Sequence, residues 1–264
     1  AGTFLNGDVS WLNHGKWTLN DGSEYEDKFE EKDYEIFKSG LKYFDEQKYT
    51  GEKNESGQMH GQGVLVMGDG ATHDGTFEFN DFIKGTYTTE GGIRYEGEFK
   101  NNKLQGKGIE ILPNGQRYEG EFKDDLRHGQ GKIFRENGTI YEGEFENGKY
   151  NGHGVKTTSE GTRYEGEFLN GKYNGYGVIT WKDGRSYEGQ FIDGLYNGQG
   201  IQKFPSGYSY NGEFKDDLKH GEGVYHFKDG SVYRGSYKND LKHGQGIENY
   251  ADGARYEGQF KNGN

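Results

Sequence analysis

YEGEFENGKYNGHGVKTTSEGTR, residues 141–163, is followed without a gap by YEGEFLNGKYNGYGVITWKDGRS, residues 164–186. Both stretches are 23 residues long, open on Tyr-Glu-Gly-Glu-Phe and continue with Asn-Gly-x-Gly. The opening motif recurs at this spacing, with glycine two positions and an aromatic residue four positions after each leading tyrosine: Tyr95, Tyr118, Tyr141, Tyr164, Tyr187, Tyr210, Tyr233 and Tyr256. A fixed period of this length indicates a repeat protein in which each unit packs on its neighbours.

The pattern inside one repeat predicts two antiparallel strands. Tyr141, Gly143 and Phe145 alternate with acidic residues, which is typical of a strand with one buried face. A polar turn separates this strand from the second one, which begins at the Gly-x-Gly pair. Asp-Gly and Asn-Gly then favour the positive φ angles of a tight turn, as at Asp183-Gly184. The sequence therefore predicts an all-β fold, an elongated single-layer antiparallel β-meander solenoid of 23-residue hairpin repeats.

Spacing within such a sheet leaves gaps between the leading tyrosines. Neighbouring strands lie about 4.8 Å apart, so equivalent rings are roughly 10 Å apart and the intervening strand must fill the space. The apolar residues expected to do so are Val155, Val178, Ile201, Val224 and Ile247, with Trp181, Phe204, Phe227 and Tyr250 just beyond them. The glycines are expected to let the sheet bend and leave a groove lined by tyrosine and phenylalanine, a surface suited to a peptide or helix.

The repeats are regular over only part of the chain. We expect regular repeats over 95–264, the last one incomplete, divergent repeats over 49–94, where His73 replaces a leading tyrosine, and degenerate repeats or a cap over 1–48. Because the chain starts at Ala1 and stops at Asn264 in what reads as mid-repeat, we expect a fragment of a longer protein.

Composition and charge exclude several function classes. A formal net charge of -12 disfavours nucleic acid or an anionic membrane as the main partner, so membrane association is expected to be indirect if it occurs. The chain has no cysteine, which fits a reducing, cytoplasmic compartment. Acid pairs such as Glu142 and Glu144 recur identically and are interpreted as a solvated face, whereas a catalytic acid needs an individual environment. Histidines such as His128 recur too far apart for one zinc ion. We therefore expect no enzyme activity, no metal and no cofactor.

The motif Tyr-Glu-Gly-Glu-Phe, then Asn-Gly-x-Gly or His-Gly-x-Gly, then Asp-Gly, resembles the membrane occupation and recognition nexus (MORN) repeat family. The resemblance is nearly complete for the units that begin at Tyr95 through Tyr233, partial over 49–94 and faint over 1–48. It implies a β-meander, protein partners that include helical segments, and a homodimer in some members. It also implies a cytoskeletal or ciliary setting.

We therefore expect a non-enzymatic interaction scaffold that binds helical or extended partner segments, or a second copy, along an aromatic groove. The alternatives are a regulatory arm of a larger enzyme, such as a lipid kinase or protein methyltransferase, and a membrane-tethering module. The residues predicted to bind the partner lie in the regular central repeats: Tyr118, Phe122, Tyr141, Phe145, Tyr164, Phe168, Tyr187 and Phe191.

Overall fold

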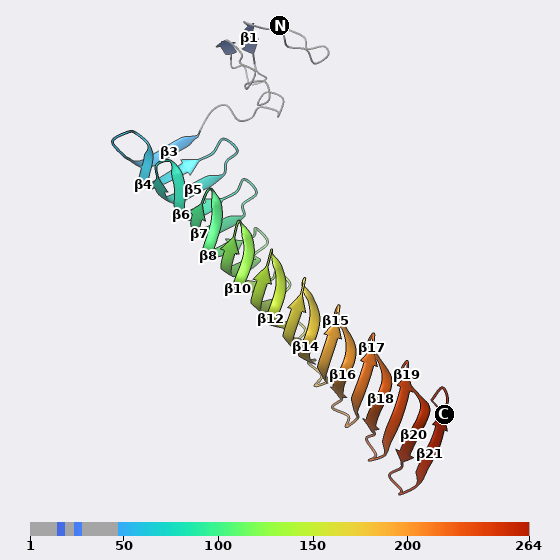
Figure 1. Ribbon diagram of the computed structural model, residues 1–264. Coiled ribbons are helices and arrows are strands. Elements are labelled where there is room, and N and C mark those ends of the chain that lie inside the picture. The colour runs from blue at the N-terminus through green and yellow to red at the C-terminus, as the bar shows by residue number, and fades with distance from the viewer. Residues whose placement is uncertain (1–14, 19–23, 28–46, 264) are drawn as a thin grey trace.

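The computed structural model describes residues 15–18, 24–27 and 47–263 (Figure 1). Most of the predicted N-terminal segment 1–48 therefore lies outside the described residues. Two short strands within it, β1 (Gly15–Thr18) and β2 (Glu24–Asp27), pair with each other in antiparallel orientation. Within the described residues there is no helix long and apolar enough to cross a bilayer.

The main sheet runs from β3 to β21, and the chain alternates between a first strand that carries the leading tyrosine and a second strand that carries Gly-x-Gly. The strands are β3 (Lys48–Lys53), β4 (Met59–Val66), β5 (Thr72–Glu78), β6 (Asp81–Thr88), β7 (Arg94–Lys100), β8 (Lys103–Ile111), β9 (Arg117–Lys123), β10 (Leu126–Phe134), β11 (Ile140–Glu146), β12 (Lys149–Thr157), β13 (Arg163–Leu169), β14 (Lys172–Thr180), β15 (Ser186–Ile192), β16 (Leu195–Lys203), β17 (Ser209–Lys215), β18 (Leu218–His226), β19 (Val232–Lys238), β20 (Leu241–Asn249) and β21 (Arg255–Phe260).

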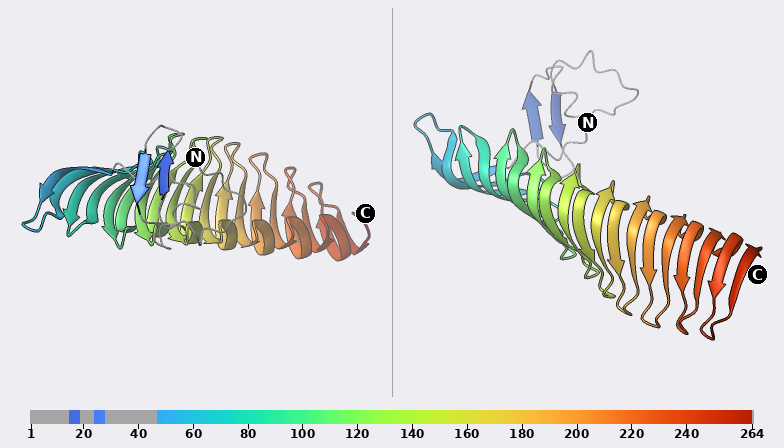
Figure 2. Two further views of the ribbon diagram at one scale, coloured as in Figure 1. Left: turned by 90° about the horizontal axis from the view of Figure 1, so that it is seen from above. Right: turned by 60° about the horizontal axis from the view of Figure 1, so that its bottom comes forward.

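Every ladder in this sheet joins two strands that are consecutive in the sequence, and all of them are antiparallel. The result is a long, twisted, single-layer ribbon with β3 and β21 at its two ends, and its strands run across the long axis (Figures 1 and 2). The predicted all-β meander of 23-residue hairpins is confirmed.

The register places the tyrosine, glycine and phenylalanine of each motif on one face, as expected. Gly143 lies opposite Gly131 on one side and Gly154 on the other. Phe145 lies opposite Tyr150 in its own hairpin. The leading tyrosines from Tyr118 to Tyr233 are 0% exposed, so this face carries the core of the protein. We call it the aromatic face, and the opposite side the acidic face.

The glycines are required because the leading tyrosines from Tyr118 to Tyr233 each lie flat across a pair of them. A Cβ added at Gly177 would lie 2.4 Å from the Tyr164 hydroxyl and 2.7 Å from its ring carbons. The same hydroxyl donates a hydrogen bond to the carbonyl of Glu167 at 2.8 Å. Burial raises the pKa of Tyr164, so the hydroxyl stays protonated and keeps donating.

The first glycine of each Gly-x-Gly pair produces a bulge. Gly152 has φ +58°, and the ladder between β11 and β12 shifts register beside it. Glu144 closes the bulge, because its Oε1 accepts a hydrogen bond from the backbone N–H of His153 at 3.1 Å. Bulges bend strands and increase their twist, and the strands of the ribbon are visibly curved (Figure 2). The second acid of the motif is therefore a structural group and not only a solvated one.

The prediction that valine and isoleucine of the second strand fill the space between tyrosines was wrong, whereas Trp181 and Phe227 do pack against the core. Val155 lies opposite Glu142 and Glu165, so it belongs to the acidic face. The reason is strand alternation: Gly154 faces the tyrosine, so the next residue faces away. The positions between the leading tyrosines are instead held by residues of mixed character: Glu110, Ile133, Lys156, Ile179, Gln202, Tyr225 and Glu248.

The hairpin tips connect successive repeats. Asp217 has a φ of +69°, and its counterparts Asp125 and Asp240 have +67° and +68°. The backbone N–H of Asp217 donates a hydrogen bond to the carbonyl of Tyr196 at 3.1 Å. Asp217 Oδ1 accepts a hydrogen bond from the backbone N–H of Tyr196 at 2.8 Å. The tip aspartate thus holds a neighbouring repeat.

Asp217→Ala is expected to lower the free energy of unfolding by about 1 kcal/mol, because it removes this hydrogen-bond acceptor and leaves a side chain less suited to positive φ. Urea denaturation of the variant measures the loss. Asp217→Asn keeps both the acceptor and the backbone preference and should stay close to the parent protein. An equal loss in the two variants would contradict the assigned hydrogen bond.

Candidate partner-binding surface

The structure brings together all of the residues predicted to bind a partner, but it places them beneath the surface. Their exposed fractions are 0% for Tyr118, Tyr141, Tyr164 and Tyr187, and 1–4% for Phe122, Phe145, Phe168 and Phe191. Ring centroids of Tyr141 lie 5.1 Å from Phe145 and 5.0 Å from Phe168 of the next repeat, both in edge-to-face geometry. These rings form the floor of the aromatic face, and their contact with a partner stays a prediction.

A second row of side chains, which sequence analysis missed, lies on top of this floor. Each member is found nine positions after a leading tyrosine, or after His73, and we call the set the cover row: Phe82, Leu104, Arg127, Tyr150, Tyr173, Tyr196, Lys219 and Lys242. Tyr150, Tyr173 and Tyr196 stack face to face on the tyrosines below them, with centroid distances of 3.7 to 3.8 Å. The rings of the cover row in the central repeats are therefore the outer layer of the aromatic face.

Cations take the same place in other repeats. Arg127 lies 5.3 Å from the Tyr118 ring centroid, and Lys242 Nζ lies 4.8 Å from that of Tyr233. A guanidinium or ammonium over a tyrosine is favoured by the ring quadrupole. The position therefore accepts aromatic and cationic groups that lie over a ring and, at Leu104, an aliphatic side chain.

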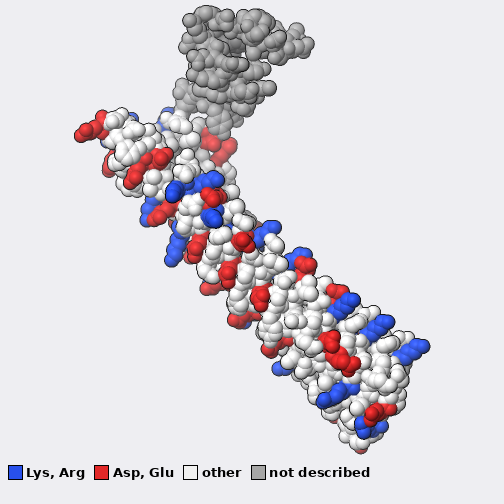
Figure 3. All heavy atoms as spheres, in the orientation of Figure 1, with Lys and Arg blue, Asp and Glu red and all other residues white. Residues whose placement is uncertain are grey.

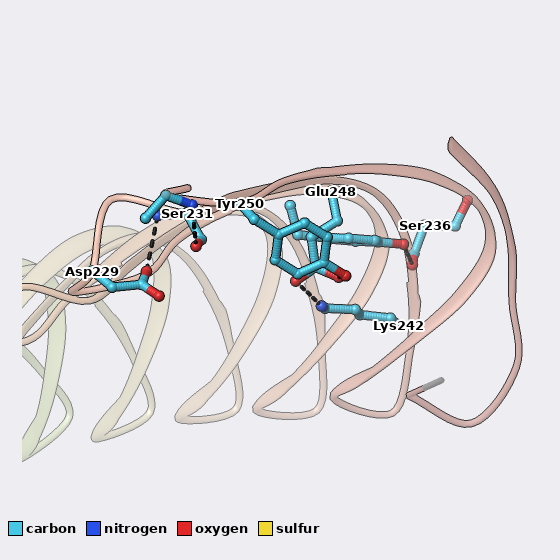
Figure 4. Close-up of polar contacts among 8 residues, drawn as sticks. Asp229, Ser231, Ser236, Lys242, Glu248 and Tyr250 are labelled. Carbon is cyan, nitrogen blue, oxygen red and sulfur yellow. Dashed lines mark hydrogen bonds and ion pairs between the residues drawn. The ribbon is translucent and has the colours of Figure 1, made fainter. Parts of the chain in front are cut away.

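A third set of side chains lies between the leading tyrosines, and we call it the bridge row, from Glu110 to Glu248. Its two acids are paired with the cover row. Arg127 Nη2 lies 2.6 Å from Glu110 Oε2, and Lys242 contacts Glu248. Figure 4 shows Lys242 and Tyr250 converging on Glu248, whose exposed fraction is 8%. Toward each end of the aromatic face, a cation of the cover row is thus neutralised by an acid of the bridge row.

The middle of the aromatic face is different because it carries cations without acids. Arg135 Nε donates to the Tyr150 hydroxyl at 3.0 Å, and its guanidinium lies 5.6 Å from that ring. Lys156 belongs to the bridge row, and its Nζ lies 5.5 Å from the Tyr173 ring. Burial and then the charge of Arg135 lower the pKa of Lys156. Among the described residues, neither cation forms an ion pair with a carboxylate.

The acidic face has a balanced, solvated chemistry. Lys132 pairs with Glu142 at 2.8 Å, and Arg163 pairs with Glu165 at 2.7 Å, with all four side chains well exposed. Figure 3 shows acidic and basic groups interspersed along the visible side of the ribbon. Exposed pairs of this kind contribute little to stability.

The histidines next to Gly-x-Gly do not converge. Over the described part of the chain, no three His, Cys, Asp or Glu side chains are grouped as a metal site requires. His128 and His220 each carry a buried Nδ1 without a protein hydrogen-bond partner.

Comparison with known proteins gives one strong match. The family model described as MORN repeat matches residues 49–72, 95–117, 118–140, 141–163, 164–184, 187–207, 210–232, 233–255 and 256–264. No curated protein sequence is recovered as a relative.

Solved structures give weaker likenesses. The chain is 14% identical to the TCP domain of Drosophila melanogaster SAS-4, solved with a proline-rich motif of Ana2, over 58% of this chain and 84% of that one, with a TM-score of 0.37. It is 16% identical to the TCP10 domain of Danio rerio CPAP, over 72% and 88%, with a TM-score of 0.34. Scores this low carry no argument about the function of this chain.

Proposed function

The chain belongs to the MORN repeat family, and from that premise we propose that it is a non-enzymatic protein-interaction scaffold whose aromatic face binds a partner segment. The observation that carries the proposal is the cover row. Tyr173 and Tyr196 are only partly buried although they lie on a fully buried floor. Trp181, Tyr225 and Phe227 are also partly buried and pack against the core. Tyrosine and tryptophan held rigidly at a surface are favoured contact residues in protein interfaces.

The shape of the ribbon supports a long, narrow partner. The aromatic face repeats every two strands, roughly every 10 Å, so it offers the same kind of contact many times along one line. A helical or extended segment, or a second copy of this chain, would match such a line, because each makes regularly spaced contacts. In keeping with the family, we place this activity in a cytoskeletal or ciliary assembly of the cytoplasm.

This proposal is tested by using the whole chain as bait and analysing the proteins that it retains by cross-linking mass spectrometry. We expect one partner segment to cross-link to a succession of repeats between Tyr95 and Tyr256. Retention of phosphoinositide or another lipid without a protein would favour membrane tethering instead.

Tyr173→Leu with Tyr196→Leu is expected to weaken binding of that partner at least tenfold, because both rings leave the surface. Leucine is already used in the cover row at Leu104, so the fold is preserved. Tyr176→Leu is the matched control, since this tyrosine of the same repeat is 52% exposed and its hydroxyl contacts Glu188 on the acidic face. Affinity measured by isothermal titration should fall only for the first variant. Equal effects would show that the aromatic face is not the binding surface.

A further inference from the structure

The aromatic face carries several cations although the whole protein is acidic. The chain carries a formal net charge of -12, yet the cover row contributes Arg127, Lys219 and Lys242. Arg127 and Lys242 are neutralised within the aromatic face, and Lys219 Nζ pairs with Asp240 at 3.1 Å. The two cations of the middle section, Arg135 and Lys156, remain.

Arg135 and Lys156 come from consecutive repeats, and each is held by a ring of the repeat that follows its own. Arg135 is fixed by Tyr150, and Lys156 by Tyr173. Lys156 lies opposite Tyr141 in the ladder, and Tyr150 stacks on Tyr141 with the ring centroids 3.7 Å apart. Because Arg135 donates to the hydroxyl of Tyr150, both cations lie beside the same stacked pair of rings. Burial and then the charge of Arg135 lower the pKa of Lys156, which is consistent with two like charges that repel each other. Two like charges held together without a counter-charge are destabilising by themselves, and an anion placed between them would relieve the repulsion.

Their surroundings define what kind of anion fits. Ile133 and Ile179 flank Lys156 in the bridge row, and Tyr173 and Trp181 belong to the same section of the aromatic face. Arginine binds carboxylates through two parallel hydrogen bonds, while lysine acts as a point charge. An aspartate or glutamate with apolar neighbours in a peptide would satisfy both the cations and the rings.

Resting on the proposed function, we propose that the section of the aromatic face around Arg135 and Lys156 selects an acidic partner segment, with one carboxylate between these two cations and apolar side chains against Tyr173 and Trp181. A peptide is favoured over a lipid surface because the overall charge of -12 repels an anionic membrane. Because Glu110 and Glu248 already pair with cations toward the two ends of the ribbon, the preference for an acidic segment is confined to its middle.

Selection of random peptides displayed on phage against the whole chain tests this assignment. Long-range attraction to a protein of charge -12 would enrich basic peptides. We expect the reverse, an enrichment of aspartate or glutamate next to leucine, isoleucine or an aromatic residue. Enrichment of basic or neutral peptides would overturn the acidic preference while leaving a peptide-binding aromatic face in place. Selection of no peptide at all would count against both this inference and the proposed function.

Variants drawn from the chain's own repeats locate the effect. Gln202 and Thr158 occupy the positions that correspond to Lys156 and Arg135 in other repeats, so Lys156→Gln with Arg135→Thr should fold normally. We expect this variant to bind a selected acidic peptide tenfold to a hundredfold more weakly and to lose discrimination against the same peptide with glutamine for glutamate. Arg163→Gln, on the acidic face, is the matched control and should retain both.

The same variant also identifies a competing occupant. Sedimentation of the parent protein should show no self-association that depends on Arg135 and Lys156. A dimer that forms in the parent and is lost in the Lys156→Gln, Arg135→Thr variant would assign the site to a second copy of the chain and overturn the peptide assignment.

Discussion

Tyr164→Ala is expected to lower the free energy of unfolding by about 4 kcal/mol, within the range found when a large buried aromatic residue is truncated. The ring of Tyr164 is 0% exposed and contacts three others, with centroids 5.1 Å from Phe168, 3.8 Å from Tyr173 and 5.3 Å from Phe191. Its removal leaves a cavity that reaches into the following repeat, because Phe191 belongs to that repeat. Urea denaturation followed by fluorescence measures the loss.

Adding Phe168→Ala should increase the loss by less than its own single effect, because the two rings are in contact and their contributions are not additive. The double variant should also lose partner binding, since the floor under Tyr173 disappears. Tyr164→Phe is the control, because it keeps the ring and removes only the hydrogen bond to Glu167. It should lower the free energy of unfolding by about 1 kcal/mol. A double variant with unchanged stability and unchanged binding would contradict the role of these rings.

Gly166→Ala is expected to cost about 3 kcal/mol, at the upper end of the range for overpacking. The added methyl group would lie 2.5 Å from the Cα of Gly177 and 2.6 Å from the carbonyl oxygen of Tyr176, both of them backbone atoms of the paired strand. Backbone cannot rotate away as a side chain does, so the ladder between β13 and β14 must separate. The same urea titration reports the change.

Gly171→Ala separates this clash from the general cost of losing a glycine. Gly171 has φ +86° at a hairpin tip, and an added Cβ would meet no atom within 4 Å. Only the backbone penalty of roughly 1–2 kcal/mol applies there. If Gly166→Ala costs no more than Gly171→Ala, the close fit of neighbouring strands at the glycine pairs does not hold.

The sequence predicted the fold well because its information is local and periodic. Tyr141, Gly143 and Phe145 define a strand face by alternation, and Asp183-Gly184 defines a turn by its backbone preference, with Gly184 at φ +85°. Neither inference needs knowledge of distant contacts. The tyrosine-on-glycine fit also follows from the expectation that glycine permits close approach.

The surface was harder to predict, for two physical reasons. Val155 was assigned inward because it is apolar, but in a single layer both faces are partly open, and polarity does not identify the inner one. The cover row was missed because the side chains of Tyr150, Arg127 and Lys242 differ in hydrophobicity. What they have in common is the ability to lie over a ring. The spacing of nine residues from each leading tyrosine was the available signal.

Because each hairpin pairs only with its immediate neighbours, gene duplication or deletion of one 23-residue unit changes the length of the ribbon without altering how any other unit folds. Each unit still chooses its own residues in the cover row and bridge row, as Tyr173 beside Ile179 and Lys242 beside Glu248 illustrate. The residues that one unit presents on the aromatic face can therefore change during evolution independently of the other units, while the backbone that carries them stays the same.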